Sequence, residues 1–163
     1  AERWRTIITT DSRVMSAEIF RKHGSADFNR SFAGLTAAVP EQDLAQYMRA
    51  LADRTRLLRL WALFMEDYPL VLAPVSQVPP FRQDADLEGA NRMRQMLDEQ
   101  ALLYGVNLLG LPSVAVPTGL HGQSPMGVQI IGQRFREDLC LDAAAAIERK
   151  VGVLARQLWT RTA

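Results

Sequence analysis

The segment from Gly110 to Gly132, GLPSVAVPTGLHGQSPMGVQIIG, constrains the fold most, because glycine and proline divide it into short apolar runs. The runs SVAV and MGVQII are rich in β-branched residues and have the length of strands. Pro117-Thr-Gly119 is expected to end the first strand, and residues 122–125 are expected to turn the chain into the second. The segment therefore predicts two neighbouring, paired strands.

Two further features belong to this strand pattern. The apolar residues between Pro69 and Pro74 form a run that is too short for a helix and typical of a strand buried on both faces. Gly127 interrupts the MGVQII run, which indicates a bulge or a close approach of two backbones. Three strands are therefore predicted in all.

Helical spacing of apolar residues dominates the rest of the chain. Helices are predicted over residues 4–23, 39–68, 84–105, 137–152 and 153–161, with residues 25–38 as a linker. The second helix is expected to begin at Val39-Pro40, because proline and the acidic residues Glu41 and Asp43 suit a first turn. Gly24, Gly105 and Gly152 are expected to close helices.

These elements predict an α/β fold, with a partial mixed sheet of about three strands flanked by helices. We treat residues 1–163 as a single unit, with 1–68 mainly helical and 69–163 combining strands and helices. Three strands make a narrow sheet for so much helix, and the first residue is Ala rather than Met. The sequence is therefore expected to be a piece of a larger α/β domain whose other strands lie upstream.

Charge and cysteine content exclude several classes of partner. The 19 basic and 18 acidic residues nearly cancel, which argues against nucleic acid or an anionic membrane as a partner. No apolar run has the length of a membrane span. The single Cys140 fits a reducing cytoplasm. His23 and His121 are far apart and no phosphate-binding glycine loop is present, so no metal or organic cofactor is expected.

Three segments, YPLVLAPV, VNLLGLPSVAVPTG and SPMGVQIIGQRFREDLCLDAAAAIE, occur in an order that resembles the C-terminal portion of the amidase signature family. The resemblance covers residues 60–150, and the helical first third is compatible with it. The matching motif positions, interpreted as structural, are Asn107, Gly110, Pro112, Pro117, Gly119, Pro125, Gly127 and Gly132, together with Pro74 and Gln129.

The resemblance implies a large mixed sheet between helices and hydrolysis of carbon–nitrogen bonds in small-molecule amides. It also implies a nucleophilic serine, a second serine that relays protons and a lysine base with a depressed pKa. Backbone amides of a Gly/Ser-rich loop would bind the oxyanion. The substrate remains open between a small aliphatic amide, an aromatic amide and an amide on a larger carrier.

This sequence departs from the family in its catalytic elements. It contains no Ser-Ser or Gly-Gly dipeptide, and its two lysines, Lys22 and Lys150, are interpreted as solvated helix ends. Ser113 begins a strand and lacks the surroundings of a nucleophile elbow. We therefore assign no catalytic residue and expect the chain alone to be inactive, with its nucleophile, relay serine and base in a missing N-terminal part.

The loop after the first strand is predicted to be a pocket wall, because α/β proteins often place ligand-contacting loops at strand ends. The predicted wall is the segment from Pro74 to Phe81, with Pro74, Val75, Ser76 and Gln77 as its named candidates. Gln129 is polar within an apolar strand; we favour a hydrogen bond to a neighbouring turn over contact with substrate, although it is kept as a wall candidate. Cys140 is interpreted as a small buried hydrophobe and His121 as an exposed turn residue.

Two other interpretations stay open. The chain could be a non-catalytic structural or interaction module that pairs with another chain through open strand edges. A self-contained helical interaction domain over residues 40–68 and 84–105 is less favoured, because it leaves the strands without neighbours. A homodimer that buries Trp61, Phe64 or the sheet edge is a further hypothesis.

Overall fold

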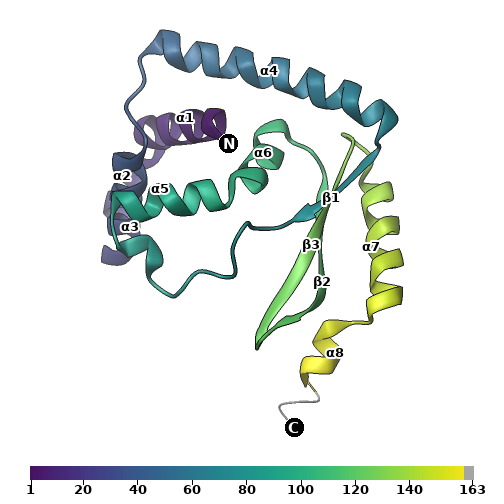
Figure 1. The fold of residues 1–163 in the computed structure, drawn as a ribbon. Helices are drawn as coiled ribbons and strands as arrows, with labels where there is room; N and C mark the ends of the chain where they lie inside the picture. Colours follow the sequence, from purple (N-terminus) through teal and green to yellow (C-terminus); the bar gives the residue numbers. More distant parts are fainter. Residues whose placement is uncertain (160–163) are drawn as a thin grey trace.

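The computed structural model describes residues 1–159, and in this part of the chain three strands form one antiparallel sheet of order β1-β3-β2 (Figure 1). The strands are β1 (Leu70–Pro74), β2 (Ser113–His121) and β3 (Ser124–Gly132). The helices are α1 (Glu2–Asp11), α2 (Ala17–His23), α3 (Ala26–Ala38), α4 (Leu44–Asp67), α5 (Ala90–Glu99), α6 (Ala101–Leu109), α7 (Glu137–Val151) and α8 (Leu154–Trp159). A π-helical turn, Ser12–Ser16, joins α1 to α2, and a 3-10 turn, Ala85–Leu87, precedes α5. The predicted α/β class is confirmed.

The β2–β3 hairpin turns at residues 122–123, where Gly122 has a left-handed φ of 61°. Contrary to expectation, Pro117 does not end β2, because the strand continues to His121 through a register shift between Pro117 and Gly119. Proline cannot donate to the ladder, and a bulge accommodates it. Opposite Pro117, a Cβ on Gly127 would lie 2.5 Å from the Val116 carbonyl oxygen, so the predicted close approach is confirmed.

Strand β1 lies at an edge of the sheet. It pairs with β3 in a register that sets Leu70 opposite Gly132 and Pro74 opposite Val128. The prediction that β1 is buried on both faces is wrong, because the side chain of Leu72 is 62% exposed. Val71 and Ala73 pack against the cluster of Met65, Val106 and Ile131, so β1 buries the face opposite to Leu72.

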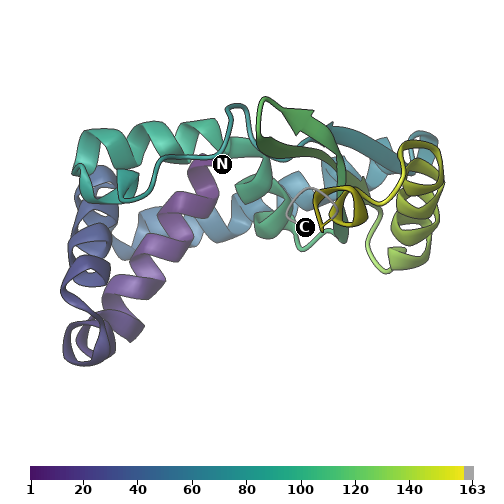
Figure 2. The same cartoon turned by 90° about the horizontal axis from the view of Figure 1, so that it is seen from below.

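Helices cover the two faces of β3. Met65 of α4 and Val106 of α6 pack with Ile131, while Cys140 of α7 lies against the neighbouring Gly132. Because successive strand residues point to opposite faces, α7 covers the face opposite to α4 and α6. A second apolar cluster joins α3 and α5 through Ala38, Met93 and Leu97, with Trp4 of α1 packed against it. Figure 2 shows these early helices at one end of an elongated molecule and α7 at the other.

Two helices begin where the sequence pattern did not place them. The linker predicted over residues 25–38 is helix α3, because the Ser25 hydroxyl caps it by accepting from the Phe28 amide at 3.1 Å. Helix α4 begins at Leu44 rather than at Pro40. Asp43 and Gln46 form a reciprocal capping box there, with bonds of 2.8 and 2.7 Å.

The helix predicted over residues 84–105 is also different. It divides into α5 and α6 at Gln100, and α6 runs past Gly105 to Leu109. Gly110, with φ 61°, ends it in the left-handed conformation that favours glycine. Gly152 ends α7 as expected, whereas residues 160–161 of the last predicted helix lie outside the described residues.

The close approach at Gly127 makes a substitution test. Gly127→Ala is expected to lower the free energy of unfolding by about 1–3 kcal/mol, because its methyl group overlaps backbone that must shift. Gly105→Ala is the control: it lies inside α6 with open space around it and should be neutral or stabilise by up to about 1 kcal/mol. Chemical denaturation checks both; equal midpoints for Gly127→Ala and wild type contradict the described strand approach.

Candidate functional site: an apolar pocket at the end of the first strand

A cavity of about 350 Å³ opens where β1 ends. Residues 74–76 and 78–81 form one wall, and residues 115–117 and 125–127 of the hairpin form the other. Gln100, at the junction of α5 and α6, completes the lining. Apart from Gln100 and Ser76, the lining side chains are apolar, and they contain no lysine or histidine. The cavity is therefore suited to an apolar group with a polar substituent.

The structure separates the predicted wall residues into two sets. Pro74, Val75 and Ser76 line the cavity, whereas Gln77 and Gln129 do not. The backbone N–H of Gln77 points towards α5 and donates to the Glu99 carbonyl at 2.9 Å. Gln129 is 2% exposed, and its Nε2 donates to the Pro74 carbonyl at 3.2 Å. Both glutamines therefore hold the wall from behind.

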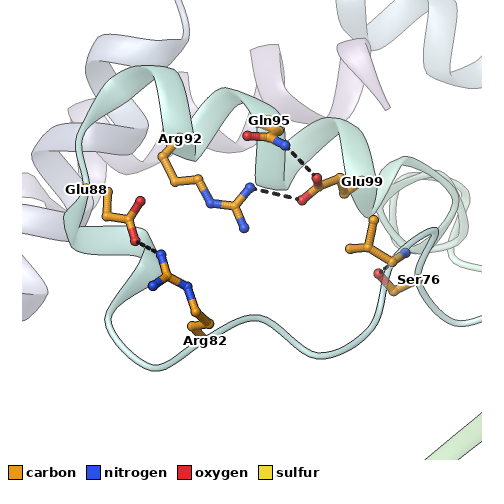
Figure 3. Close-up of polar contacts among 7 residues, drawn as sticks. Ser76, Arg82, Glu88, Arg92, Gln95 and Glu99 are labelled. Carbon is orange, nitrogen blue, oxygen red and sulfur yellow. Dashed lines mark hydrogen bonds and ion pairs between the residues drawn. The ribbon is translucent and has the colours of Figure 1, made fainter. Parts of the chain in front are cut away.

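Polar contacts fix the loop between β1 and α5. Figure 3 shows Arg92 and Gln95 converging on the Glu99 carboxylate, at 3.3 and 2.9 Å. Arg82 contacts Glu88 at 2.9 Å further along the loop. The Ser76 hydroxyl accepts from the Val78 amide at 3.4 Å, closing a tight turn in the wall. The bonds of Arg92 and Gln95 to Glu99 lie within α5, and α5 contacts the loop at the Gln77 backbone amide and at the Phe81 ring.

Sequence reasoning missed the hairpin side of the pocket. Pro117, Pro125 and Gly127 were interpreted as structural, yet they also line the cavity. The pairing of β1 with β3 brings them there, because it sets the end of β1 beside the bulged part of the hairpin. Phe81 lies at the end of the wall segment that the sequence predicts, and its aromatic side chain lines the cavity.

The other motif positions hold turns and strand ends. The Asn107 carbonyl accepts from the amide of the helix-ending Gly110 at 3.2 Å. The Pro112 carbonyl accepts from the Gly132 amide at 2.9 Å, which ties the start of β2 to the end of β3. Gly119 lies at the bulge in β2. These positions shape the frame around the pocket.

None of the candidate nucleophiles or bases lines the cavity. Ser113 and His121 are exposed at the two ends of β2, and Lys22 and Lys150 are exposed on α2 and α7. In the described part of the chain, no group of His, Cys, Asp and Glu could hold a metal ion. No described helix combines the length and apolarity needed to cross a membrane. The lining offers apolar surface with the polar groups of Ser76 and Gln100, and it does not include an activated nucleophile.

Cys140 is a buried structural residue of α7. It is 2% exposed, and its Sγ lies 3.8 Å from the Pro112 carbonyl oxygen. Burial raises the pKa of the thiol, and the carboxylates of Glu137 and Asp138 raise it further. The protonated thiol therefore serves packing rather than nucleophilic chemistry.

Comparison with known proteins assigns the family. The model of the family described as Amidase matches residues 5–141. Over 157 residues, 96% of this chain, it is 42% identical to an indoleacetamide hydrolase of Bradyrhizobium japonicum and 43% identical to one of Bradyrhizobium diazoefficiens. The structure of a bacterial aryl acylamidase of the amidase signature family superposes with a TM-score of 0.67 and 25% identity, covering 90% of this chain and 32% of that one.

The chain belongs to the amidase signature family, whose members hydrolyse amide bonds. It spans 34% and 30% of the length of the two indoleacetamide hydrolases, about a third of each. The fold and the apolar pocket described above therefore correspond to one part of the relatives' structure.

The Gln129 contact generates one prediction about the wall. Gln129→Leu removes the side-chain donor to the Pro74 carbonyl from a position that is 2% exposed, and should lower the free energy of unfolding by about 1–2 kcal/mol. Gln123→Leu, in the exposed hairpin turn, is the matched control and should change it by less than about 0.5 kcal/mol. Equal effects of the two substitutions in urea titrations contradict this role of Gln129.

Cys140 generates a second prediction. In the folded protein its reaction with a thiol reagent at pH 7.5 should be at least about tenfold slower than in denaturant, because the thiol is buried and its pKa is raised. Labelling followed by mass spectrometry measures both rates. The same rate with and without denaturant shows instead an accessible, reactive thiol.

Proposed function

We propose that this chain is a segment of a longer amidase that hydrolyses an aromatic acetamide, of the indoleacetamide type, to a carboxylate and ammonia. The observation that carries the proposal is the match, across 96% of the chain, to proteins named indoleacetamide hydrolase. The pocket supports the same substrate class, because its walls are apolar and include the ring of Phe81. Aromatic groups gain most from such walls.

In this proposal the chemistry follows a Ser–Ser–Lys mechanism with residues outside this chain. The lysine accepts a proton through the relay serine, and the nucleophilic serine attacks the amide carbonyl. An acyl–oxygen bond forms, the carbon–nitrogen bond breaks, and ammonia leaves with the relayed proton. Water then attacks the acyl-enzyme, which releases the carboxylate and regenerates the serine.

In this proposal the segment binds the substrate, and residues outside the segment make and break the covalent bonds. The hairpin end and the loop over residues 74–81 form two sides of a slot for the aromatic group. Burying that group holds the amide at the nucleophile and excludes water from it. Ser76 and Gln100 are the polar groups available to the bound molecule.

Exposed apolar side chains support a partner for this segment. At the end of α4, the side chains of Leu60, Leu63, Phe64 and the C-cap residue Tyr68 are between 47% and 60% exposed, and Leu72 lies on the edge strand β1. Because the relatives are about three times as long as this chain, we propose that the rest of the same enzyme covers these surfaces. A homodimer, or a non-catalytic module that pairs with another chain, is the alternative. The one cysteine of this chain, Cys140, is free, and we propose that the whole protein acts in the cytoplasm.

The test is ammonia release from indoleacetamide and from acetamide, with the 163-residue chain and with the full-length protein that contains it. Only the full-length protein should release ammonia. Its kcat/KM for indoleacetamide should exceed that for acetamide by at least about tenfold, because only the aromatic amide fills the apolar pocket. Activity of the short chain contradicts the placement of the nucleophile, and a preference for acetamide contradicts the substrate class.

A further inference from the structure

Phe81 is the one aromatic side chain in the pocket lining among the described residues, and a cation lies over its ring. The Cζ atom of Arg92 is 5.3 Å from the Phe81 ring centroid, within the range of a cation–π contact. Arg92 belongs to α5 and does not line the cavity. It therefore touches the wall from behind.

Arg92 is itself held in place by Glu99. The guanidinium lies 3.3 Å from one Glu99 carboxylate oxygen, and Gln95 donates to the other at 2.9 Å. The Glu99 carbonyl also accepts the Gln77 amide at 2.9 Å, at the opposite end of the wall. Glu99 thus contacts the start of the loop through its backbone and the Phe81 end through Arg92. Figure 3 shows the side-chain contacts of Arg92 and Gln95 with Glu99.

Burial distinguishes the Arg92–Glu99 ion pair of α5 from the Arg82–Glu88 ion pair that precedes α5. The side chains of Arg92 and Glu99 are 23% and 17% exposed, whereas those of Arg82 and Glu88 are 84% and 46% exposed. Solvent screens the Arg82 pair, so it contributes little to holding the loop. The Arg92–Glu99 pair is partly shielded from water. Solvent therefore screens its attraction less, and the pair holds the Arg92 guanidinium in place more strongly.

We propose that Arg92 is a positioning residue for substrate selectivity: held by Glu99, it fixes the Phe81 ring as the wall against which the aromatic group of the substrate packs. The proposal rests on the function proposed above. It predicts that loss of Arg92 affects aromatic amides more than small ones, because a small amide does not reach the ring.

The test uses the full-length enzyme with Arg92→Leu, Phe81→Ala, the double variant Phe81→Ala/Arg92→Leu, and Arg82→Leu as the matched control. The measured quantities are the ratio of kcat/KM for indoleacetamide to kcat/KM for acetamide, and the Kd of the product indoleacetate. Arg92→Leu should lower the ratio and weaken product binding by about three- to tenfold, mainly through KM. Arg82→Leu should leave both within about twofold of wild type.

The double variant separates positioning from a general structural effect. If Arg92 acts through Phe81, removing Arg92 from the Phe81→Ala enzyme should lower the ratio no further. Thermal unfolding shows whether each variant is folded. If Arg92→Leu does not fold, Glu99→Gln loosens Arg92 while keeping the shape of residue 99, and it should lower the ratio in the same direction.

The outcomes distinguish this inference from the proposed function. Wild-type enzyme that releases no ammonia from either amide contradicts the proposed function, and product binding by the variants then tests Arg92 alone. Wild-type activity with an unchanged ratio and unchanged product binding in folded Arg92→Leu overturns the inference. Additive losses in the double variant, or no binding of indoleacetate by the wild type, overturn it as well.

Discussion

The pairing of β1 with β3 is the contact on which the rest of the structure depends. It joins residues 70–74 to residues 128–132, far apart along the chain, and Gln129 adds a side-chain bond to the Pro74 carbonyl. This register places the loop that leaves β1 beside the bulged end of the hairpin, where the apolar cavity forms. A slip of one residue would reverse which side chains face α4 and α6, including the fully buried Ile131.

The architecture suggests a division of labour within the enzyme. In this segment α5 contacts the wall of the pocket at two places, at Gln77 through the Glu99 carbonyl and at Phe81 through Arg92. Its lining provides apolar surface without a base or an activated nucleophile. We therefore interpret the segment as a selectivity element, which the part of the enzyme outside it complements with chemistry.

The sequence predicted those features that local patterns determine. Strands were recognised from β-branched runs and helices from apolar spacing, and Gly127 was recognised as a close approach from its place in a strand. The linker interpretation of residues 25–38 failed because the capping bond from Ser25 outweighs a composition that includes Gly34. Gly105 was mistaken for a helix end because the left-handed Gly110 that ends α6 lies further on.

The pocket could be predicted only in part. Loop residues after β1 were accessible to strand-end reasoning, whereas the hairpin wall depends on strand register, and the Arg92–Phe81 contact depends on how the loop returns along α5. Neither property is local in sequence.

The most direct test of the central claim is to identify which serine of the full-length protein forms the acyl-enzyme. The full-length protein is treated with a fluorophosphonate, which forms a stable adduct with an activated serine, and the labelled peptide is identified by mass spectrometry. We expect the adduct on a serine outside residues 1–163. An adduct within this chain, on Ser76, Ser113 or Ser124, would contradict the claim that the segment provides selectivity and not the nucleophile.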